Sequence, residues 1–472
     1  MFPHRTRQAR IRTVIALGRR GDHRRIPERR GNVMTAAVLT ADTCIAPFAR
    51  VTGCDLQVPL VQGGTCTYAN FDYAASAPAL EAVTERIAEL LPYYASVHRG
   101  AGYASRISTS SYEQARESVA RFVCAADDQV VVFTRNTTDS LNLLAGAVPG
   151  DVVVLDVEHH ANLLPWKNAR VVEAADTVAE TVRRLVAELC SKPAALLAVT
   201  GASNVTGEVL PIAELADVAH ACGARILVDG AQLVPHRRID LTALGVDYLA
   251  FSGHKLYAPF GAGALVGRRD WLDVAEPYLA GGGAVREVRL GHTEWACAPA
   301  RHEAGTPNVL GVAALAAACD ALAGFDADAV AEHEEALCRR LLGGLRDLDG
   351  VEILRLWSDS PDSVGIVTFT VSGFEPGEVA SYLSAEHGIG VRDGRFCAHP
   401  LLARVGLPGG AVRASLGLGS SSADVDRLLD ALRGLVDAGP GWTYAKTDGL
   451  WGPSPETRPG LVESTAGAAQ CS

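Results

Sequence analysis

The feature that most constrains the fold is an alternation of short apolar runs with helical patterns between residues 130 and 266. Runs without polar residues indicate strands that are buried on both faces, as in parallel sheets covered by helices. The expected strands are 130–133, 152–155, 170–173, 194–199, 226–228, 248–251 and 264–266, and the expected helices are 137–148, 177–190 and 211–222. The pattern predicts an α/β fold with a mostly parallel, seven-stranded sheet flanked by helices.

The pattern changes after residue 306, where two Ala-rich helices (309–323 and 329–345) precede a mixture of strands and helices. This mixture predicts a smaller α+β domain. We therefore expect a lead segment at 34–66, a large domain at 67–306, a small domain at 307–440 and a flexible tail at 441–472. The tail is expected to be flexible because it is rich in Gly, Pro, Ser and Thr and lacks periodicity.

The first 33 residues hold ten Arg against Asp22 and Glu28, whereas the whole chain carries a net charge of −11. The acidic total argues against general nucleic-acid binding. The apolar run 14–18 is too short for a signal peptide, and no run is long enough for a membrane helix. A mis-assigned start or a disordered arm explains residues 1–33 better than a targeting or RNA-binding arm.

The chain has eleven Cys, with no CxxC pair and no metal-ligand spacing. An odd number of cysteines in a large chain argues against a disulfide scaffold and favours a reducing cytoplasm. No metal site is predicted, and most of these cysteines are expected to be small buried residues.

Polar clusters follow five of the predicted strands. Ligands of open α/β sheets bind at the carboxyl ends of the strands, so the clusters are expected to converge on one site. They are Arg135-Asn136-Thr137-Thr138, Glu158-His159-His160, Gly201-Ala202-Ser203-Asn204, Asp229-Gly230-Ala231-Gln232 and Ser252-Gly253-His254-Lys255.

Lys255 is the best candidate for an amine nucleophile among only four Lys in the chain. It directly follows a predicted buried strand, where partial desolvation would leave its amine neutral enough to form a Schiff base with an aldehyde. The alternative is a solvated surface lysine. Asp229 ends another buried strand and needs a cationic partner there, such as a cofactor's pyridinium nitrogen; a helix cap or a metal ligand is the alternative.

Hydroxyl and imidazole groups near the strand ends favour a phosphate site beside a helix N-terminus. They belong to Thr137, Thr138, Ser252 and His254, although the two threonines alone are better explained as a helix cap. His159 could stack on a flat cofactor and move protons; taken alone, it is better explained as a structural histidine.

Ten segments together carry a resemblance to a known family through their order and spacing. They are 71–76, 96–100, 136–139, 158–166, 203–207, 228–232, 251–257, 303–308, 391–400 and 412–415. Over residues 67–438 the chain resembles the class V aminotransferase superfamily of pyridoxal-phosphate enzymes, which have PLP fold type I. Within it, the chain is most similar to group II cysteine desulfurases and selenocysteine lyases.

The resemblance implies a role for each candidate residue. Lys255 would bind the aldehyde of pyridoxal 5'-phosphate (PLP), Asp229 would keep the pyridinium protonated, and His159 would stack on the ring. Gln232 and Asn204 would lie near the ring hydroxyl. Thr137, Thr138, Ser252 and His254 would bind the phosphate, joined by Thr306 from a partner subunit, which implies a homodimer. The substrate would contact Arg413, Arg392, Asn204, His98 and Arg99.

Cys397 occupies the position at which cysteine desulfurases carry their reactive thiol, and Arg392 and Arg395 would favour its thiolate. The implied activity converts L-cysteine to L-alanine and leaves a persulfide on Cys397 for an acceptor protein or small thiol. Two departures from the family pattern are Arg395-Phe396, where a His-His pair is usual, and His399 after the Cys. They leave open another class V reaction: a selenocysteine lyase, C–S lyase, aminotransferase or epimerase. A non-catalytic scaffold is a third alternative, which the joint presence of Lys255, Asp229, His159 and Arg413 disfavours.

Overall fold

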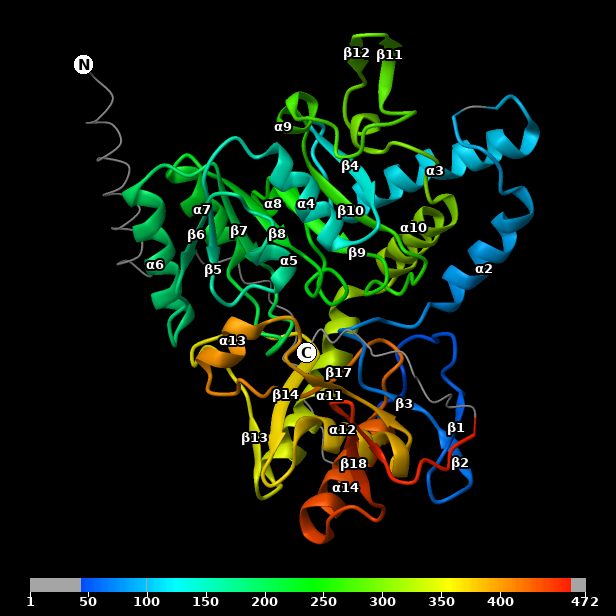
Figure 1. Cartoon of the computed structure of the whole chain (residues 1–472), viewed down its shortest axis with the longest axis vertical. Helices are drawn as coiled ribbons and strands as arrows, with labels where there is room; N and C mark the ends of the chain where they lie inside the picture. Colours follow the sequence, from blue (N-terminus) through cyan, green and yellow to red (C-terminus); the bar gives the residue numbers. More distant parts are fainter. Residues whose placement is uncertain (1–43, 99, 460–472) are drawn as a thin grey trace, which may run out of the picture.

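A computed structural model describes residues 44–98 and 100–459, which form two packed bodies (Figure 1). The upper body is built on a sheet whose strands are β4 (Gln129–Thr134), β5 (Val152–Leu155), β6 (Ala169–Val172), β7 (Leu196–Thr200), β8 (Arg225–Asp229), β9 (Tyr248–Ser252) and β10 (Gly263–Arg268). Their order is β4-β10-β9-β8-β7-β5-β6, and only β10 runs antiparallel to its neighbours. The predicted seven-stranded, mostly parallel sheet is confirmed.

Helices cover both faces of this sheet because alternate residues of each strand point to opposite sides. On β4, Val131 and Phe133 enter one core and Val130 and Val132 enter the other. The first core is covered by α3 (Tyr103–Phe122), α6 (Val178–Ser191), α7 (Ile212–Ala221) and α10 (Val309–Gly324), and the second by α4 (Thr137–Ala147) and α9 (Arg269–Val274). Shorter helical elements are α2 (Glu81–Leu90), η1 (Leu91–Tyr93), α5 (His160–Leu163), α8 (Leu241–Leu244) and η2 (Ala300–His302).

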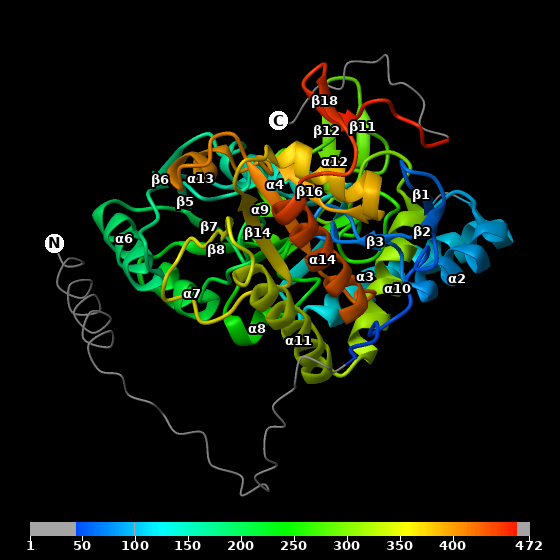
Figure 2. The same ribbon diagram turned by 90° about the horizontal axis from the view of Figure 1, so that it is seen from below.

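The lower body holds a four-stranded antiparallel sheet in the order β13-β14-β17-β16. Its strands are β13 (Val351–Ile353), β14 (Ile366–Val371), β16 (Arg392–Gly394) and β17 (Ala411–Ser415). Three helices pack over it, α11 (Ala327–Arg346), α12 (Pro376–His387) and α14 (Ser422–Ala438), as Figure 2 shows from below. A short helix, α13 (His399–Arg404), follows β16 and the Cys397 segment.

The predicted domain boundaries at 66/67 and 306/307 do not separate these two bodies. Strand β3 (Ala69–Asn70) pairs with β15 (Ile389–Gly390), and Ala69 and Phe71 lie in the core of the lower body. Conversely, α10 packs against α3 in the core of the upper body. Periodicity predicts that a segment is helical or extended, but not which body it packs against.

The expectation of a flexible tail is wrong for residues 441–459. Strands β18 (Tyr444–Thr447) and β19 (Leu450–Pro453) form a hairpin that packs on α12. Glu375, just before α12, accepts hydrogen bonds from Lys446 at 2.8 Å and from the Trp451 indole at 3.1 Å. The strands are too short to show periodicity, and the aromatic side chain supplies the anchoring. Residues 460–472, like the basic segment 1–33, lie outside the described residues.

Two further hairpins complete the fold. Strands β1 (Gln57–Pro59) and β2 (Thr65–Thr67) lie beside the lower body, and β11 (Val285–Arg289) and β12 (His292–Trp295) project from the top of the molecule (Figure 1). Within the described ranges no single helix is long and apolar enough to span a membrane; α10 and α11 meet that test only as a pair bent by 91°.

The expectation that most cysteines are buried is also wrong. Of the ten cysteines in the described residues, only Cys319 is buried and five are exposed. Several stand at helix ends, such as Cys190 in the last turn of α6 and Cys222 at the end of α7. Such positions are solvent-accessible whatever the polarity of the residue.

Candidate active site

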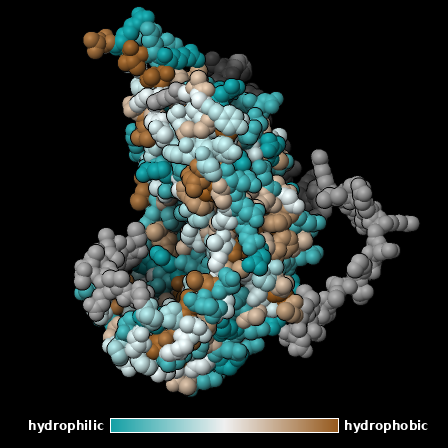
Figure 3. All heavy atoms as spheres, turned by 90° about the vertical axis from the view of Figure 1, so that its right-hand side faces the viewer, coloured by the Kyte–Doolittle hydropathy of each residue, from teal (hydrophilic) through white to brown (hydrophobic). Residues whose placement is uncertain are grey.

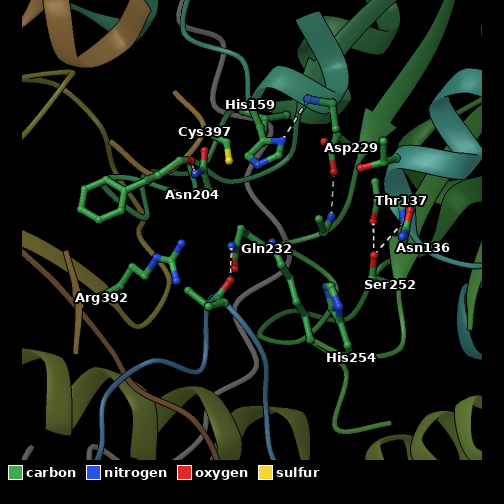
Figure 4. Close-up of a pocket in the computed structure, with 18 of the residues that line it drawn as sticks. Asn136, Thr137, His159, Asn204, Asp229, Gln232, Ser252, His254, Arg392 and Cys397 are labelled. Atoms are coloured by element: carbon green, nitrogen blue, oxygen red, sulfur yellow. Dashed lines mark hydrogen bonds between the residues drawn. The ribbon is translucent and has the colours of Figure 1, made fainter. Parts of the chain in front are cut away.

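The five polar strand ends meet in one cavity of about 260 Å³ between the two bodies. Arg392, Cys397 and Asn204 lie on one side of it and Asn136, Thr137 and Ser252 on the other, with His159, Asp229 and Gln232 between them (Figure 4). Twelve of the residues predicted from the sequence line the cavity: Thr137, Thr138, His159, Asn204, Asp229, Gln232, Ser252, His254, Lys255, Arg392, Cys397 and Arg413.

Lys255 lies in the turn that follows β9, and its side chain enters the cavity. Burial lowers the pKa of its amine to about 8, and the positive charge of Arg413 acts in the same direction; Asp229 opposes both. At neutral pH roughly one amine in ten is then unprotonated, far more than for a solvated lysine. The position therefore suits an amine that must react as a nucleophile or a base.

Asp229, the last residue of β8, is only 4% exposed. Its Oδ1 accepts a hydrogen bond from the Ala231 N–H at 3.0 Å. Burial raises the pKa of this carboxyl, and the charge of Lys255 opposes the rise. A buried carboxylate with so little compensation favours a cation in the cavity.

His159 caps α5 at the end of the β5 segment, and its Nδ1 accepts the Ala161 N–H at 3.0 Å. Burial, followed by the charge of Lys255, lowers the pKa of the ring to about 3. The imidazole is therefore neutral at physiological pH. A neutral ring at this place can stack on a flat aromatic group.

Glu158 lies behind His159 and is fully buried. Its carboxyl group accepts hydrogen bonds from the Asn162 amide at 2.8 Å and from the Thr200 N–H at 3.0 Å. Burial raises its pKa to about 8. These contacts tie the loop that carries His159 to the end of β7.

The N-terminus of α4 faces the cavity opposite Cys397. Asn136 caps the helix by accepting the Asp139 N–H, and Ser252 Oγ accepts the Thr137 N–H at 2.8 Å. Ser252 Oγ also lies 2.7 Å from Thr137 Oγ1. Hydroxyl groups at a helix N-terminus are suited to bind a phosphate.

Arg413 on β17 stands directly opposite Arg392 on β16 in the sheet register. Arg413 is 4% exposed and donates through Nη1 to the Asn204 carbonyl at 2.8 Å and through Nη2 to Asp72 at 3.3 Å. Its buried Nε has no hydrogen-bond partner among the described residues. Leaving a buried guanidinium N–H unsatisfied is costly, so an added carboxylate is favoured here.

Gln232 carries a second orphaned polar atom in the cavity. Its amide nitrogen donates to the Ala74 carbonyl at 2.9 Å, and its buried Oε1 lacks a hydrogen-bond partner in the described structure. This oxygen fits a ligand hydroxyl. Together, the two orphaned atoms indicate that the cavity is built around a polar ligand.

Cys397 precedes α13 and is partly exposed to the cavity. Its carbonyl accepts the His160 N–H at 2.9 Å, and the preceding carbonyl of Phe396 accepts the Asn204 amide at 2.8 Å. Phe396 and Cys397 both have positive φ values, 54° and 52°. Two hydrogen bonds thus fasten a thiol-bearing turn whose backbone conformation is uncommon for non-glycine residues.

Two predicted site residues that the structure describes, Thr306 and His98, do not line the cavity. Thr306 is exposed and does not line it. His98 precedes α3 and is exposed, and its Nε2 lies 2.9 Å from Glu113 on that helix. Within one chain, therefore, neither contacts a ligand in the cavity, and Arg99 lies outside the described residues.

The sequence reasoning missed some residues that shape the site. Asp72 pairs with Arg413 although 341 positions separate them, so no local signal connects them. Phe396 lines the cavity but was noted only as a departure from a pattern. Asn136 belongs to a cluster that the sequence places at the site, but its own role is to cap α4, which an Asn that precedes Thr-Thr signals.

The family model for "Aminotransferase class-V" matches residues 69–428. The chain belongs to the class V aminotransferase family. Among its relatives, a protein named cysteine desulfurase from Dickeya dadantii (strain 3937) is 40% identical over 381 residues, which cover 77% of this chain and 91% of that protein.

Two solved structures extend the comparison. The apo structure of a cysteine desulfurase from Thermococcus onnurineus NA1 is 32% identical with a TM-score of 0.74, covering 82% of this chain and 98% of the other. The cysteine desulfurase CsdA from Escherichia coli, in an S-sulfonic acid form, is 36% identical with a TM-score of 0.68, covering 77% and 94%. These matches place the chain among class V enzymes, a family that uses PLP.

Proposed function

We propose that this protein is a PLP-dependent cysteine desulfurase that converts L-cysteine to L-alanine and holds the sulfur as a persulfide on Cys397. One observation carries the proposal: the Cys397 thiol lines the same cavity as the amine of Lys255 and the buried guanidinium of Arg413. The cavity thus offers an amine for an aldehyde cofactor, a cation for a carboxylate and a nucleophile for sulfur. The relatives named cysteine desulfurase support the same reaction.

The cavity residues fit PLP. Asp229 would supply the anion beside the pyridinium, the orphaned Gln232 Oε1 would accept from the ring hydroxyl, and the start of α4 with Ser252 would hold the phosphate. His159 offers its neutral ring to the cofactor face, and Lys255 offers its amine to the aldehyde. When bound, PLP supplies an electron sink for the substrate's α-carbon.

The chain's own residues then have distinct tasks. Arg413 binds the substrate carboxylate, and Lys255 Nζ takes the proton from the α-carbon. The thiolate of Cys397 attacks the substrate sulfur: a sulfur–sulfur bond forms and the carbon–sulfur bond breaks, with its electron pair remaining on the carbon side. The β-carbon gains a proton, Lys255 Nζ returns a proton to the α-carbon, alanine leaves, and the sulfur stays on Cys397 at the persulfide oxidation level.

Mass spectrometry tests this proposal directly. After PLP-loaded protein is mixed with L-cysteine, alkylated and digested, we expect the peptide with Cys397 to carry one additional sulfur atom. The exposed Cys54 and Cys297 serve as internal controls and should carry none. Extra sulfur spread evenly over all three peptides, or found on none of them, would contradict the proposal.

A second class V reaction is favoured by one observation. The residue before the thiol is Phe396, which has no titratable group to support sulfur chemistry and which lines the cavity. This fits a selenocysteine lyase, C–S lyase, aminotransferase or epimerase. Incubation with L-selenocysteine and a panel of amino acids, followed by analysis for selenide, pyruvate and keto acids, separates these reactions from desulfuration.

We further propose a homodimer in a reducing cytoplasm, with a sulfur-acceptor protein or small thiol as the persulfide's destination. Large apolar side chains are exposed on η1 and at the start of α3, among them Leu91 (56%) and Tyr103 (77%). At the top of Figure 3, hydrophobic residues also gather on the projecting hairpin, where Leu290 is fully exposed. A partner subunit that covers these side chains could bring Thr306 to the phosphate, and light scattering should then report twice the chain's mass.

The pKa of Lys255 predicts how cofactor loading depends on pH. Only the neutral amine attacks an aldehyde, and a pKa lowered to about 8 means that the neutral fraction grows as the pH rises through 8. We expect the rate at which apoprotein gains visible absorbance from added PLP to increase up to a pH of about 8 and then level off. A rate that keeps rising steeply beyond pH 10, as for a solvated lysine, would contradict this prediction.

A further inference from the structure

We propose that Phe396 is a positioning residue that links the carboxylate-binding guanidinium of Arg413 to the thiol-bearing turn at Cys397. The inference rests on the proposed function and deepens it, because it makes the substrate's α-carboxylate the group that this linkage serves. Phe396 is 6% exposed and lines the cavity between the two residues it would connect.

The ring of Phe396 lies against Arg413. The guanidinium Cζ is 5.2 Å from the ring centroid, within the range of a cation–π contact. The Nη1 and Nη2 atoms are engaged by Asn204 and Asp72, which leaves Nε as the buried N–H without a partner. The ring therefore lies over the guanidinium, which lines the cavity and whose Nε has no hydrogen-bond partner in the described structure.

Asn204 makes a second connection between the same two residues. Its amide nitrogen donates to the Phe396 carbonyl at 2.8 Å, and its own carbonyl accepts from Arg413 Nη1 at 2.8 Å. Phe396, Asn204 and Arg413 thus form a closed set of three mutual contacts. Asn204 itself lies in a buried segment after β7, so the set is fixed to the large sheet.

The backbone explains why such a clamp is needed. Phe396 and Cys397 are consecutive residues with positive φ. This backbone conformation is unfavourable for residues that carry a Cβ atom, and glycine is the residue that adopts it readily. The turn keeps this conformation because the surroundings hold it. Contacts at Phe396 therefore also place the thiol of the next residue, and loss of the ring should loosen both the guanidinium and the turn.

Substrate binding with and without a carboxylate tests the proposal. L-cysteine and cysteamine share the amine and the thiol, and only L-cysteine has the carboxylate. Their affinities are read from the visible spectrum of PLP-loaded protein in a Cys397→Ala background, so that binding is measured without sulfur removal. The variants are Phe396→Leu, which removes the ring, and Phe396→Tyr, which retains it.

We expect Phe396→Leu to weaken L-cysteine binding about tenfold, as for a buried cation–π contact, and cysteamine binding by less than about twofold. Phe396→Tyr should leave both within about twofold. Equal weakening of both ligands, or no weakening by Leu, would overturn the proposal. Because this titration involves no persulfide, its failure is distinct from the failure of the desulfurase reaction. Circular dichroism and thermal unfolding of each variant show whether it is folded.

A separate observation carries a second proposal: the structure assigns Cys190 and Cys222 as a site of reversible disulfide formation. Their Sγ atoms are 3.3 Å apart, Cys190 in the last turn of α6 and Cys222 at the end of α7. Cys190 is exposed, so an oxidant can reach it. Both helices end just before β7 and β8 begin, at the sheet edge opposite the cavity.

The oxidant that this step requires is a peroxide. Hydrogen peroxide takes two electrons and two protons from the two thiols, becomes two molecules of water, and leaves one sulfur–sulfur bond. The bond would join the C-terminal ends of two helices that cover the same sheet face. It should stabilise the fold by closing a loop of about 30 residues, with little effect on the distant cavity.

Peptide mapping of peroxide-treated, PLP-loaded protein tests this site. We expect the map to show a linked Cys190–Cys222 peptide that has lost two hydrogens. Thermal unfolding of the treated protein should give a Tm raised by several degrees. Dithiothreitol should reverse both changes. Cys190→Ser should abolish the shift in Tm, whereas Cys124→Ser, at another exposed cysteine, should not. Absence of the linked peptide, or linkage of Cys190 to other cysteines as often as to Cys222, would overturn the assignment.

Discussion

Substitution of Lys255 by Ala is expected to reduce desulfuration by at least about 1000-fold, because a positioned base and the cofactor's anchoring amine are lost together. The fold should remain intact. Lys255 is half-buried, and desolvation lowers the pKa of its amine to about 8. The folded protein therefore loses hydration of this amine rather than gaining stability from it. Unfolding of the apoprotein should therefore occur at the same temperature or higher.

The measurement combines steady-state alanine production with the visible spectrum of the reconstituted variant. Lys446→Ala is a matched control. Lys446 lies on the C-terminal hairpin, far from the cavity, and pairs with Glu375 at the start of α12. The control should retain full activity and absorbance. Borohydride treatment should leave a pyridoxyl group on position 255 of the unsubstituted protein. Substantial activity in Lys255→Ala, or a pyridoxyl group on another lysine, would refute the assignment.

Substitution of Cys397 by Ala should have the second-largest effect. Alanine formation from L-cysteine should fall at least about 100-fold, the lower end of what a positioned catalytic side chain contributes. Binding should persist, because the groups proposed to hold the cofactor and the carboxylate lie on or shortly after β5, β8 and β9, on β17 and at the start of α4 rather than on the thiol turn.

The same assay distinguishes the thiol's chemistry from its bulk. Cys397→Ser retains nearly the same size and should lose as much activity as Cys397→Ala. Cys297→Ala, at an exposed cysteine, is the matched control and should be unaffected. If Cys397→Ala released sulfur from L-cysteine at the original rate, the attack by this thiol would have to be abandoned.

The parts of the fold that could be predicted are those in which burial produces a recognisable run of apolar residues in the sequence. Strands such as β7 and β9 are buried on both faces, so nearly every residue is apolar and the signal is continuous. The convergence of the polar strand ends followed from the geometry of parallel sheets. Both results depend on residues close together in sequence.

What failed depends on residues far apart in sequence. Asp72 pairs with Arg413 because the segment after β3 lies beside β17 in the lower body, 341 positions further along the chain. Phe396 stacks on Arg413 from the segment between β16 and β17. Helix α10 packs against α3, and the periodicity of a helix predicts which face is buried but not which element covers that face. The C-terminal hairpin was missed because two four-residue strands are too short for their alternation to be recognised.

Product analysis of the PLP-loaded protein with L-cysteine, with and without a thiol reductant, tests the central claim most directly. A desulfurase whose sulfur passes through Cys397 should yield one alanine for each sulfur atom released, and turnover should accelerate when the reductant removes the persulfide. Pyruvate and ammonia in place of alanine would show that the carbon–sulfur bond breaks by elimination, without attack by Cys397, and would contradict the proposed reaction.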